Sequence, residues 1–278
     1  MMYTGMKASM ADWREKSDAD PDFFELILQQ TDEYGGSSLK ALERTGVPWF
    51  GHLPTSFGGE DERILMNIAS SDMAIREQSR SIINDLIRIT SDNANPAGWI
   101  LHAPTSWNFS TKRSLFSKGG DGELRDAMDW VSSLHKKVFI ENVPPAILWK
   151  GEIYFTDPFA FEAEHPLLDT GHLYAHTQSN TSFLTQILER VKKTTYWHLA
   201  TLVKNQPYDV HGKIFAAKEQ EYPDAHLLRK TLSAISNVQH ESQRDMYIVC
   251  EPGGDTNLHV RNLQRLRKEL NALTHGGT

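Results

Sequence analysis

The most constraining feature of this sequence is a regular alternation of short apolar segments with longer amphipathic ones. We expect eight strands, at residues 3–9, 23–28, 47–53, 97–103, 137–143, 166–169, 195–200 and 246–251. Between most of them, apolar side chains recur at helical spacing, as at Ile82, Ile83 and Leu86. The predicted helices cover residues 38–44, 61–90, 123–135, 182–193, 225–238 and 262–273. Residues 147–156 fit a small hairpin.

Strands that alternate with helices eight times are typical of a (β/α)8 TIM barrel, an α/β fold. The 278 residues of the chain suit such a barrel, which uses about 250. We find no internal repeat, low-complexity tract or linker that would divide the chain. The sequence therefore predicts a single TIM-barrel domain over residues 1–278.

Composition narrows the classes of partner. The net charge of -7 and the pI near 5.9 give no general electrostatic reason to expect nucleic acid. The one cysteine, Cys250, cannot form an internal disulfide, so a cytoplasmic location is expected. No stretch approaches the roughly 20 apolar residues of a membrane helix, so no membrane association is expected. The oligomeric state is left open.

Six successive predicted strands each carry, near the C-terminal end, a side chain able to bind a metal or move a proton. The active sites of TIM barrels lie at the C-terminal ends of the strands, so these side chains are expected to converge. One such group at a strand end is usually a cap or a turn residue, but six in succession favour a functional site. In chain order they are His52, His102, Glu141, Asp169, His198 and Glu251.

Three further groups follow the same logic. In Leu167-Leu168-Asp169-Thr170-Gly171-His172 a glycine lets the chain turn, so His172 can join Asp169. The alternative is that Asp169 caps a following helix and His172 lies on its first turn. In an extended segment Asp209 and His211 point to the same side, and both follow the seventh strand.

The nine groups are five histidines, two aspartates and two glutamates. Imidazole and carboxylate together suit Zn²⁺ or Mn²⁺, and one ion takes four to six ligands. Nine groups with carboxylates able to bridge suggest a cluster of ions. The alternative is a single ion, with the spare groups binding substrate.

These segments resemble the xylose-isomerase-like TIM barrels, the superfamily of endonuclease IV and of the sugar isomerases and epimerases. The segments that carry the resemblance are GHLPTS, WILHAP, FIEN, LLDTGH, YWHL, YDVHGK and VCEP, which span residues 51–252. By its nine matching positions the chain looks most like endonuclease IV. Phe24-Glu25-Leu26 resembles openings common among the sugar isomerases.

The resemblance to endonuclease IV implies three zinc ions. His52 and His102 with Glu141 would hold one of them, which Glu141 bridges to a second. Asp169, His198 and Glu251 would complete the second ion; His172, Asp209 and His211 would hold the third. Such a cluster activates a water for hydrolysis of a phosphodiester. The leading hypothesis is therefore a phosphodiester hydrolase acting at abasic sites in damaged DNA.

The resemblance to the sugar enzymes implies a different chemistry. There Glu141, Asp169, His198 and Glu251 would hold one ion such as Mn²⁺, and Glu141 and Glu251 would exchange a proton with a sugar or sugar phosphate. The acidic net charge favours this alternative, as does the loop after His52, which lacks an aromatic residue to probe DNA. A barrel that binds a ligand without turnover is a third hypothesis.

Overall fold

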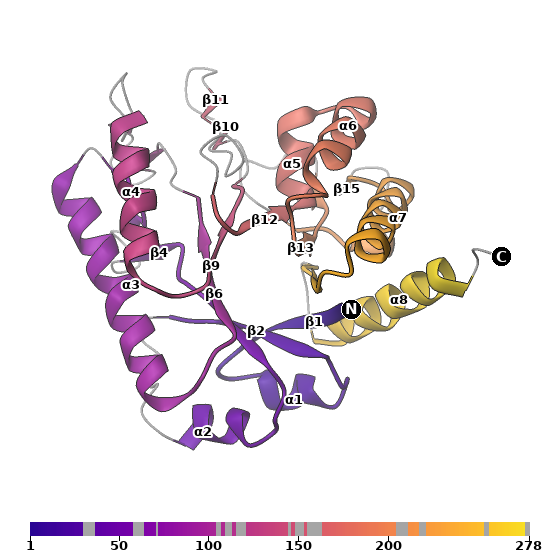
Figure 1. Ribbon diagram of the computed structural model, residues 1–278, viewed down its shortest axis with the longest axis horizontal. Coiled ribbons are helices and arrows are strands. Elements are labelled where there is room, and N and C mark those ends of the chain that lie inside the picture. The colour runs from indigo at the N-terminus through magenta and orange to yellow at the C-terminus, as the bar shows by residue number, and fades with distance from the viewer. Residues whose placement is uncertain are drawn as a thin grey trace.

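The computed structural model shows eight parallel strands that close into a barrel (Figure 1). In spatial order the barrel strands are β1 (Met2–Ser9), β2 (Phe23–Ile27), β3 (Trp49–His52), β6 (Gly98–His102), β9 (Val138–Glu141), β12 (Pro166–Asp169), β13 (Tyr196–Leu199) and β16 (Met246–Cys250). The last strand pairs with the first, from Met2 beside Met246 to Met6 beside Cys250. The predicted (β/α)8 TIM barrel is confirmed, and each predicted strand matches a barrel strand within about two residues.

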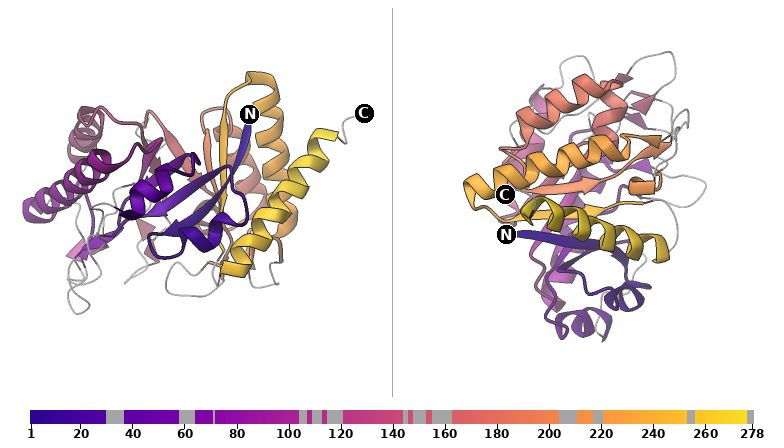
Figure 2. Two further views of the ribbon diagram at one scale, coloured as in Figure 1. Left: turned by 90° about the horizontal axis from the view of Figure 1, so that it is seen from below. Right: turned by 90° about the vertical axis from the view of Figure 1, so that its right-hand side faces the viewer.

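The structure describes residues 1–29, 37–57, 64–70, 72–103, 107–108, 113–114, 121–143, 146–147, 153–154, 163–203, 211–216, 221–252 and 256–275. Over these residues the helices are α1 (Trp13–Ser17), α2 (Ser37–Glu43), α3 (Met73–Asn93), α4 (Asp121–Ser133), α5 (Thr170–Thr177), α6 (Asn180–Arg190), α7 (Ala225–Ser242) and α8 (Thr256–His275). Figure 2 shows them on the outside of the barrel. No helix in these ranges is long and apolar enough to cross a membrane.

Helix α1 was not predicted, and α8 begins six residues before the predicted start at residue 262. Two further differences have local reasons. The helix predicted from residue 61 begins instead at Met73, because the Asp72 side chain caps it by accepting from the backbone N–H of Ala74 and Ile75. Helix α5, which was not among the predicted helices, begins directly after β12 with Asp169 as its N-cap.

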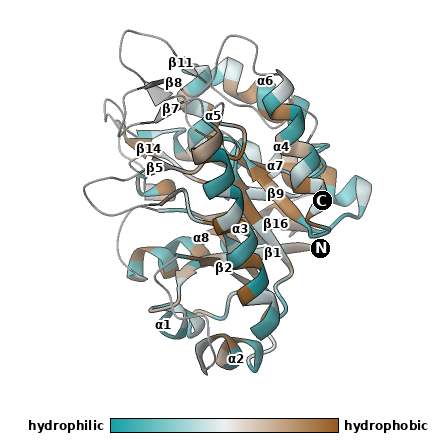
Figure 3. Ribbon diagram, turned by 90° about the vertical axis from the view of Figure 1, so that its left-hand side faces the viewer, coloured by the Kyte–Doolittle hydropathy of each residue, from teal (hydrophilic) through white to brown (hydrophobic). Residues whose placement is uncertain are grey.

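Antiparallel strand pairs follow four of the barrel strands. They are β4 (Ser56–Phe57) with β5 (Ile64–Leu65), β7 (Trp107–Asn108) with β8 (Arg113–Ser114), β10 (Ala146–Ile147) with β11 (Ile153–Tyr154), and β14 (Leu202–Val203) with β15 (Glu221–Tyr222). The pair β10–β11 confirms the predicted hairpin. A 3-10 turn, η3 (Ile214–Ala216), precedes β15. Strands of all four pairs group on one side of the molecule in Figure 3.

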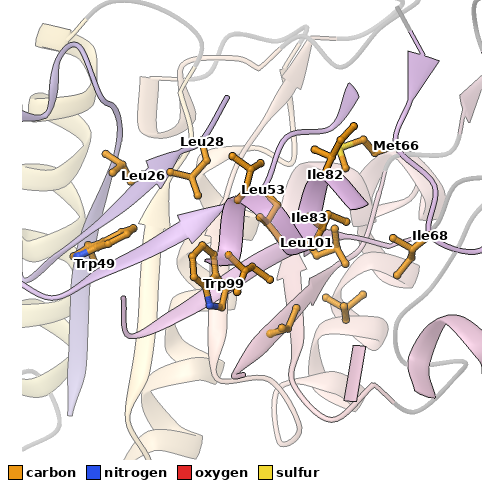
Figure 4. Packing of buried hydrophobic residues seen from close by; sticks show 14 of the residues in the cluster. Leu26, Leu28, Trp49, Leu53, Met66, Ile68, Ile82, Ile83, Trp99 and Leu101 are labelled. Carbon is orange, nitrogen blue, oxygen red and sulfur yellow. The ribbon is translucent and has the colours of Figure 1, made fainter. Parts of the chain in front are cut away.

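Outward-facing barrel side chains pack against the helices. Figure 4 shows part of this layer, where Trp99 from the barrel lies near Leu53 and Leu101, with Ile82 and Ile83 of α3 beyond them and Trp49 on the other side, near Leu26. Burial of such side chains stabilises the fold by about 1.5–3 kcal/mol each. The helices therefore hold the barrel from outside and leave its interior to a separate set of residues.

The barrel interior is divided along its axis. One end is filled by a closely packed set, the apolar barrel cluster: Phe23, Phe50, Ile100, Phe139, Leu167, Tyr196 and Val249. Its rings meet edge to face, as between Phe50 and Tyr196, whose centroids are 5.1 Å apart. Gly5 makes room for it, since a Cβ there would lie 2.3 Å from the Phe23 ring. The cluster fills that end of the barrel interior, so a site inside the barrel is expected at the other end.

Candidate metal centre

The other end of the barrel interior carries charged and polar side chains. Successive inward-facing residues of a strand are two apart, and the residue two positions after each member of the apolar barrel cluster is acidic or a histidine. We call this set the polar ring: Glu25, His52, His102, Glu141, Asp169, His198 and Glu251. Six of its seven members are the predicted strand-end groups, and all but His102 are buried.

Glu141 lies at the centre of the polar ring. Its Oε1 is 2.9 Å from Nδ1 of His198, and its Oε2 is 3.2 Å from Nε2 of His102 and 3.4 Å from Nε2 of His52. Burial disfavours its charged form, but the charges of His198 and His102 outweigh burial and hold the pKa of Glu141 well below its usual range. Glu141 is therefore a carboxylate at neutral pH.

Asp169 has two roles. Its Oδ1 accepts from the backbone N–H of His172 at 2.7 Å, which caps α5, so the alternative of a capping Asp169 with His172 on the first helical turn is confirmed. As a member of the polar ring, the same side chain has a second oxygen, Oδ2, which is buried without a hydrogen-bond partner. The side chain of Asn142 fixes this strand end by bonding both the N–H and the carbonyl of Asp169. Burial raises the pKa of Asp169, against the opposing effect of His172.

His198 links the two glutamates of the centre. Its Nδ1 lies 2.9 Å from Glu141 Oε1 and 3.0 Å from Glu251 Oε1. Burial disfavours the imidazolium, but the surrounding carboxylates, Glu141 first, outweigh burial and hold the pKa of His198 well above its ordinary value. Burial also acts against the charge of Glu251, yet His198 and the ammonium of Lys7 hold the pKa of Glu251 well below its usual range.

Backbone carbonyls orient three other imidazoles. The Nδ1 of His52 lies 3.0 Å from the Leu53 carbonyl, that of His172 lies 2.7 Å from the Asn142 carbonyl, and that of His211 lies 2.8 Å from the Glu251 carbonyl. A carbonyl only accepts, so in each case Nδ1 carries the proton, which is how metal-binding histidines are commonly oriented. Burial lowers the pKa of His52, and the charge of Lys7 adds to this effect.

Two groups of side chains in the described part of the chain can hold an ion. Glu141, Asp169, His198 and Glu251 form one, and His52, His102 and Glu141 form the other; within each, the ligand atoms lie within 4.8 Å of one another. Glu141 Oε2, Asp169 Oδ2 and His52 Nε2 are buried without a hydrogen-bond partner. Buried acceptors without donors are costly, and a divalent cation would satisfy them. The donor set thus fits a divalent metal.

Three predicted ligands remain: His172, Asp209 and His211. Over the described residues, His172 and His211 complete neither group, although their rings lie near each other with centroids 6.1 Å apart. Asp209 lies outside the described residues. The third zinc ion predicted for His172, Asp209 and His211 therefore stays a prediction.

Sequence reasoning missed two charged residues of the site. Lys7 on β1 donates a short hydrogen bond to Glu251, and Glu25 on β2 accepts from His198 Nε2 at 2.7 Å. The sequence contained a signal for both residues. Lys7 lies two positions after the inward-facing Gly5, and Glu25 lies two positions after the inward-facing Phe23. The prediction placed functional groups only at strand ends, and these two lie within their strands.

Sequence comparison leaves the chain without a relative: no family model matches it, and no curated protein matches it. Similarity appears at the level of structure. A D-tagatose 3-epimerase-like protein has 17% identity and a TM-score of 0.67, with 100% of both chains covered. An L-ribulose 3-epimerase has 13% identity and a TM-score of 0.59, covering 99% of this chain and 97% of its own.

A third similar structure is a xylose isomerase domain protein from Planctomyces limnophilus. It has 9% identity and a TM-score of 0.60, covering 98% of this chain and 97% of its own. At such identities the likeness concerns the fold. This chain has the fold of xylose-isomerase-like TIM barrels along its whole length.

The comparison corrects the leading functional hypothesis. A phosphodiester hydrolase acting at abasic sites in DNA was the wrong prediction, because the similar structures include two sugar epimerases, an epimerase-like protein and a xylose isomerase domain protein. The special closeness to endonuclease IV is likewise not shown. The nine-position pattern misled because imidazole and carboxylate ligands do not by themselves specify the substrate. The sugar isomerase or epimerase alternative is the better supported one.

Proposed function

We propose that this protein is an enzyme that epimerises or isomerises a sugar or sugar phosphate with the help of one divalent ion. The observation that carries the proposal is the group Glu141, Asp169, His198 and Glu251. These four buried side chains lie at the ends of the adjacent strands β9, β12, β13 and β16, with Glu251 directly after β16, and present ligand atoms within 4.8 Å of one another. The epimerase folds described above support the sugar as substrate class.

The four residues would hold the ion, and Mn²⁺ suits their three carboxylates and one imidazole. A bound divalent ion would polarise the substrate carbonyl and stabilise the negative charge that develops on its oxygen. The spare groups His52 and His102 would then bind substrate hydroxyls. His52 Nε2 is a buried acceptor without a partner, as a hydroxyl donor requires.

Glu141 and Glu251 would do the proton transfer. Both have pKa values well below their usual range, and both contact His198 Nδ1 through one oxygen. One glutamate removes the proton from the carbon beside the carbonyl, and the electron pair passes into the carbonyl. The other glutamate, after taking up a proton from solvent, would give it to the opposite face, which inverts that carbon; the first glutamate would then release its proton to solvent. Return of the proton to the former carbonyl carbon would instead give the isomer, provided that the hydroxyl on the deprotonated carbon passes its proton to the former carbonyl oxygen.

The test is proton exchange followed by NMR. Wild-type protein with Mn²⁺ in D₂O is incubated with ketohexoses, ketopentoses and their phosphates. We expect deuterium at the carbon beside the ketone together with the epimer of at least one sugar; deuterium with an aldose product would indicate isomerisation. Glu141→Gln and Glu251→Gln should each slow both by about 10²- to 10⁴-fold. The proposal fails if no sugar exchanges, or if the two variants exchange as fast as wild type.

A further inference from the structure

Glu25 is a buried carboxylate that the metal group does not use. It lies on β2, on the far side of His198 from the centre, and its side chain has no exposed surface. Its Oε2 accepts hydrogen bonds from His198 Nε2 at 2.7 Å and from the Tyr196 hydroxyl at 2.9 Å. A buried charge of this kind is costly unless it is paired and hydrogen-bonded, so its partners indicate its role.

The neighbouring cation completes a closed chain of contacts. Lys7 Nζ lies 3.4 Å from Glu25 Oε1 and donates a hydrogen bond to Glu251. Glu251 in turn lies 3.0 Å from His198 Nδ1. Lys7 and Glu25 therefore connect two members of the metal group, His198 and Glu251, from outside that group.

The two ring nitrogens of His198 therefore face different partners. With Nε2–H donating to Glu25, Nδ1 is turned to the space between Glu141 and Glu251, where the ion would lie. A carboxylate on the second nitrogen fixes the ring orientation and raises the basicity of a histidine ligand. We propose that Glu25 is a positioning residue, which orients His198 toward the metal, with Lys7 as its counter-ion.

The geometry favours this role over simple charge balance for Lys7. Glu25 Oε2, the oxygen nearer to His198, makes both of the hydrogen bonds. Its Oε1, which faces Lys7 at 3.4 Å, has no hydrogen-bond partner. Tyr196→Phe provides a matched control, because it removes the other bond to the same oxygen and leaves His198 untouched.

The inference rests on the proposed metal centre, and its first test is binding of Mn²⁺ alone, measured by calorimetry on the full chain. Removal of a partner of a metal-binding histidine typically weakens metal binding about 10- to 100-fold. We expect Glu25→Ala to fall in that range and Glu25→Gln, which keeps an acceptor, to lose less. Tyr196→Phe should stay within about threefold of wild type. Wild-type affinity in a folded Glu25→Ala, or an equal loss in Tyr196→Phe, would overturn the proposal.

A second readout does not depend on metal. In ¹⁵N-histidine-labelled protein, the Nε2–H of His198 should give a downfield, slowly exchanging proton that disappears in His198→Gln and shifts upfield in Glu25→Gln. Should Glu25→Ala not fold, the near-isosteric Glu25→Gln and the wild-type spectrum still decide. Absence of this proton from wild type would overturn the positioning role. A wild type that shows it but binds no Mn²⁺ would refute the metal centre and leave the orientation of His198 by Glu25 supported.

Discussion

The two ends of the barrel interior are built on one backbone pattern and carry opposite chemistry. At one end Phe23, Phe50 and Phe139 pack ring against ring; two residues further along the same strands, Glu25, His52 and Glu141 surround the site. A step of two residues keeps a side chain inside the barrel, so the pattern fixes where a side chain points and leaves its chemistry free. The residues that stabilise the barrel interior and the residues of the candidate site thus lie at different levels of the same strands.

The energetic roles of the two ends differ accordingly. The apolar barrel cluster gains free energy from burial and edge-to-face contacts. The polar ring brings together four buried carboxylates, and isolated charges of this kind are costly to remove from water. The polar ring is expected to contribute little to stability without an ion, while the apolar barrel cluster offsets its cost.

The largest effect should follow from removing one charge of the polar ring. Glu141→Gln deletes a proposed proton-transfer group, and such groups contribute about 10²- to 10⁴-fold to rate. We expect a loss of that size in the rate of sugar turnover, measured by NMR at saturating Mn²⁺. Glu77→Gln on α3, whose side chain is 64% exposed, is the control and should retain wild-type rate. Equal rates for the two variants would remove Glu141 from the mechanism.

The matching change at the apolar end should act on stability. Phe139 contacts Phe50 and Tyr196, with ring centroids 5.9 and 5.0 Å away. Phe139→Ala leaves a cavity, and we expect the free energy of unfolding to fall by about 3–5 kcal/mol in urea denaturation. Leu188→Ala, at a side chain 63% exposed, should change it by less than about 0.5 kcal/mol. A loss below about 1 kcal/mol for Phe139→Ala would contradict the role given to the cluster.

A smaller effect should follow from adding one carbon to the apolar end. In Gly5→Ala the new Cβ would lie 2.3 Å from the Phe23 ring, and overpacking of a core typically costs about 1–3 kcal/mol. Gly122→Ala is the contrasting variant, since Gly122 lies in α4 with nothing within 4 Å of a Cβ; it should stabilise by up to about 1 kcal/mol. Thermal and urea unfolding of both proteins would check this, and a Gly5→Ala protein as stable as wild type would show that the cluster is loosely packed.

The effect that is smallest at neutral pH concerns His259 on α8, near the polar end. Burial lowers its pKa to about 4, and the charge of Lys16 adds to this. The unfolded chain binds a proton near pH 6.5, and the folded chain binds it only near pH 4, so stability falls as the pH drops through that window. We expect wild type to lose about 1–3 kcal/mol more than His259→Gln between pH 7 and pH 4. Parallel pH profiles in urea denaturation would contradict this.

The fold was predictable because eight apolar segments in alternation with helices leave few other architectures. The strand-end groups were predictable for the same reason, since parallel strands deliver their last residues to one mouth. Lys7 and Glu25 were missed because the prediction read strand ends and ignored the inward-facing position within β1 and β2. The step of two from Gly5 and Phe23 would have identified them.

The chemistry was less predictable than the positions. Imidazole and carboxylate are general metal ligands, so ligand types could not separate DNA from sugar. The dual role of Asp169 shows a related ambiguity: one oxygen caps α5 and the other is a candidate ligand, and a sequence offers both readings equally. The similarity of folds was needed to favour the sugar alternative over the DNA hypothesis.

The central claim is that the polar end of the barrel is built for one divalent ion. The most direct test is elemental analysis of protein equilibrated with Mn²⁺ and freed of unbound metal, with the double variant Asp169→Asn/Glu251→Gln as its control. We predict about one ion per chain for wild type and much less for the variant. No retained metal in wild type, two or three ions per chain, or equal metal in both proteins would contradict the claim.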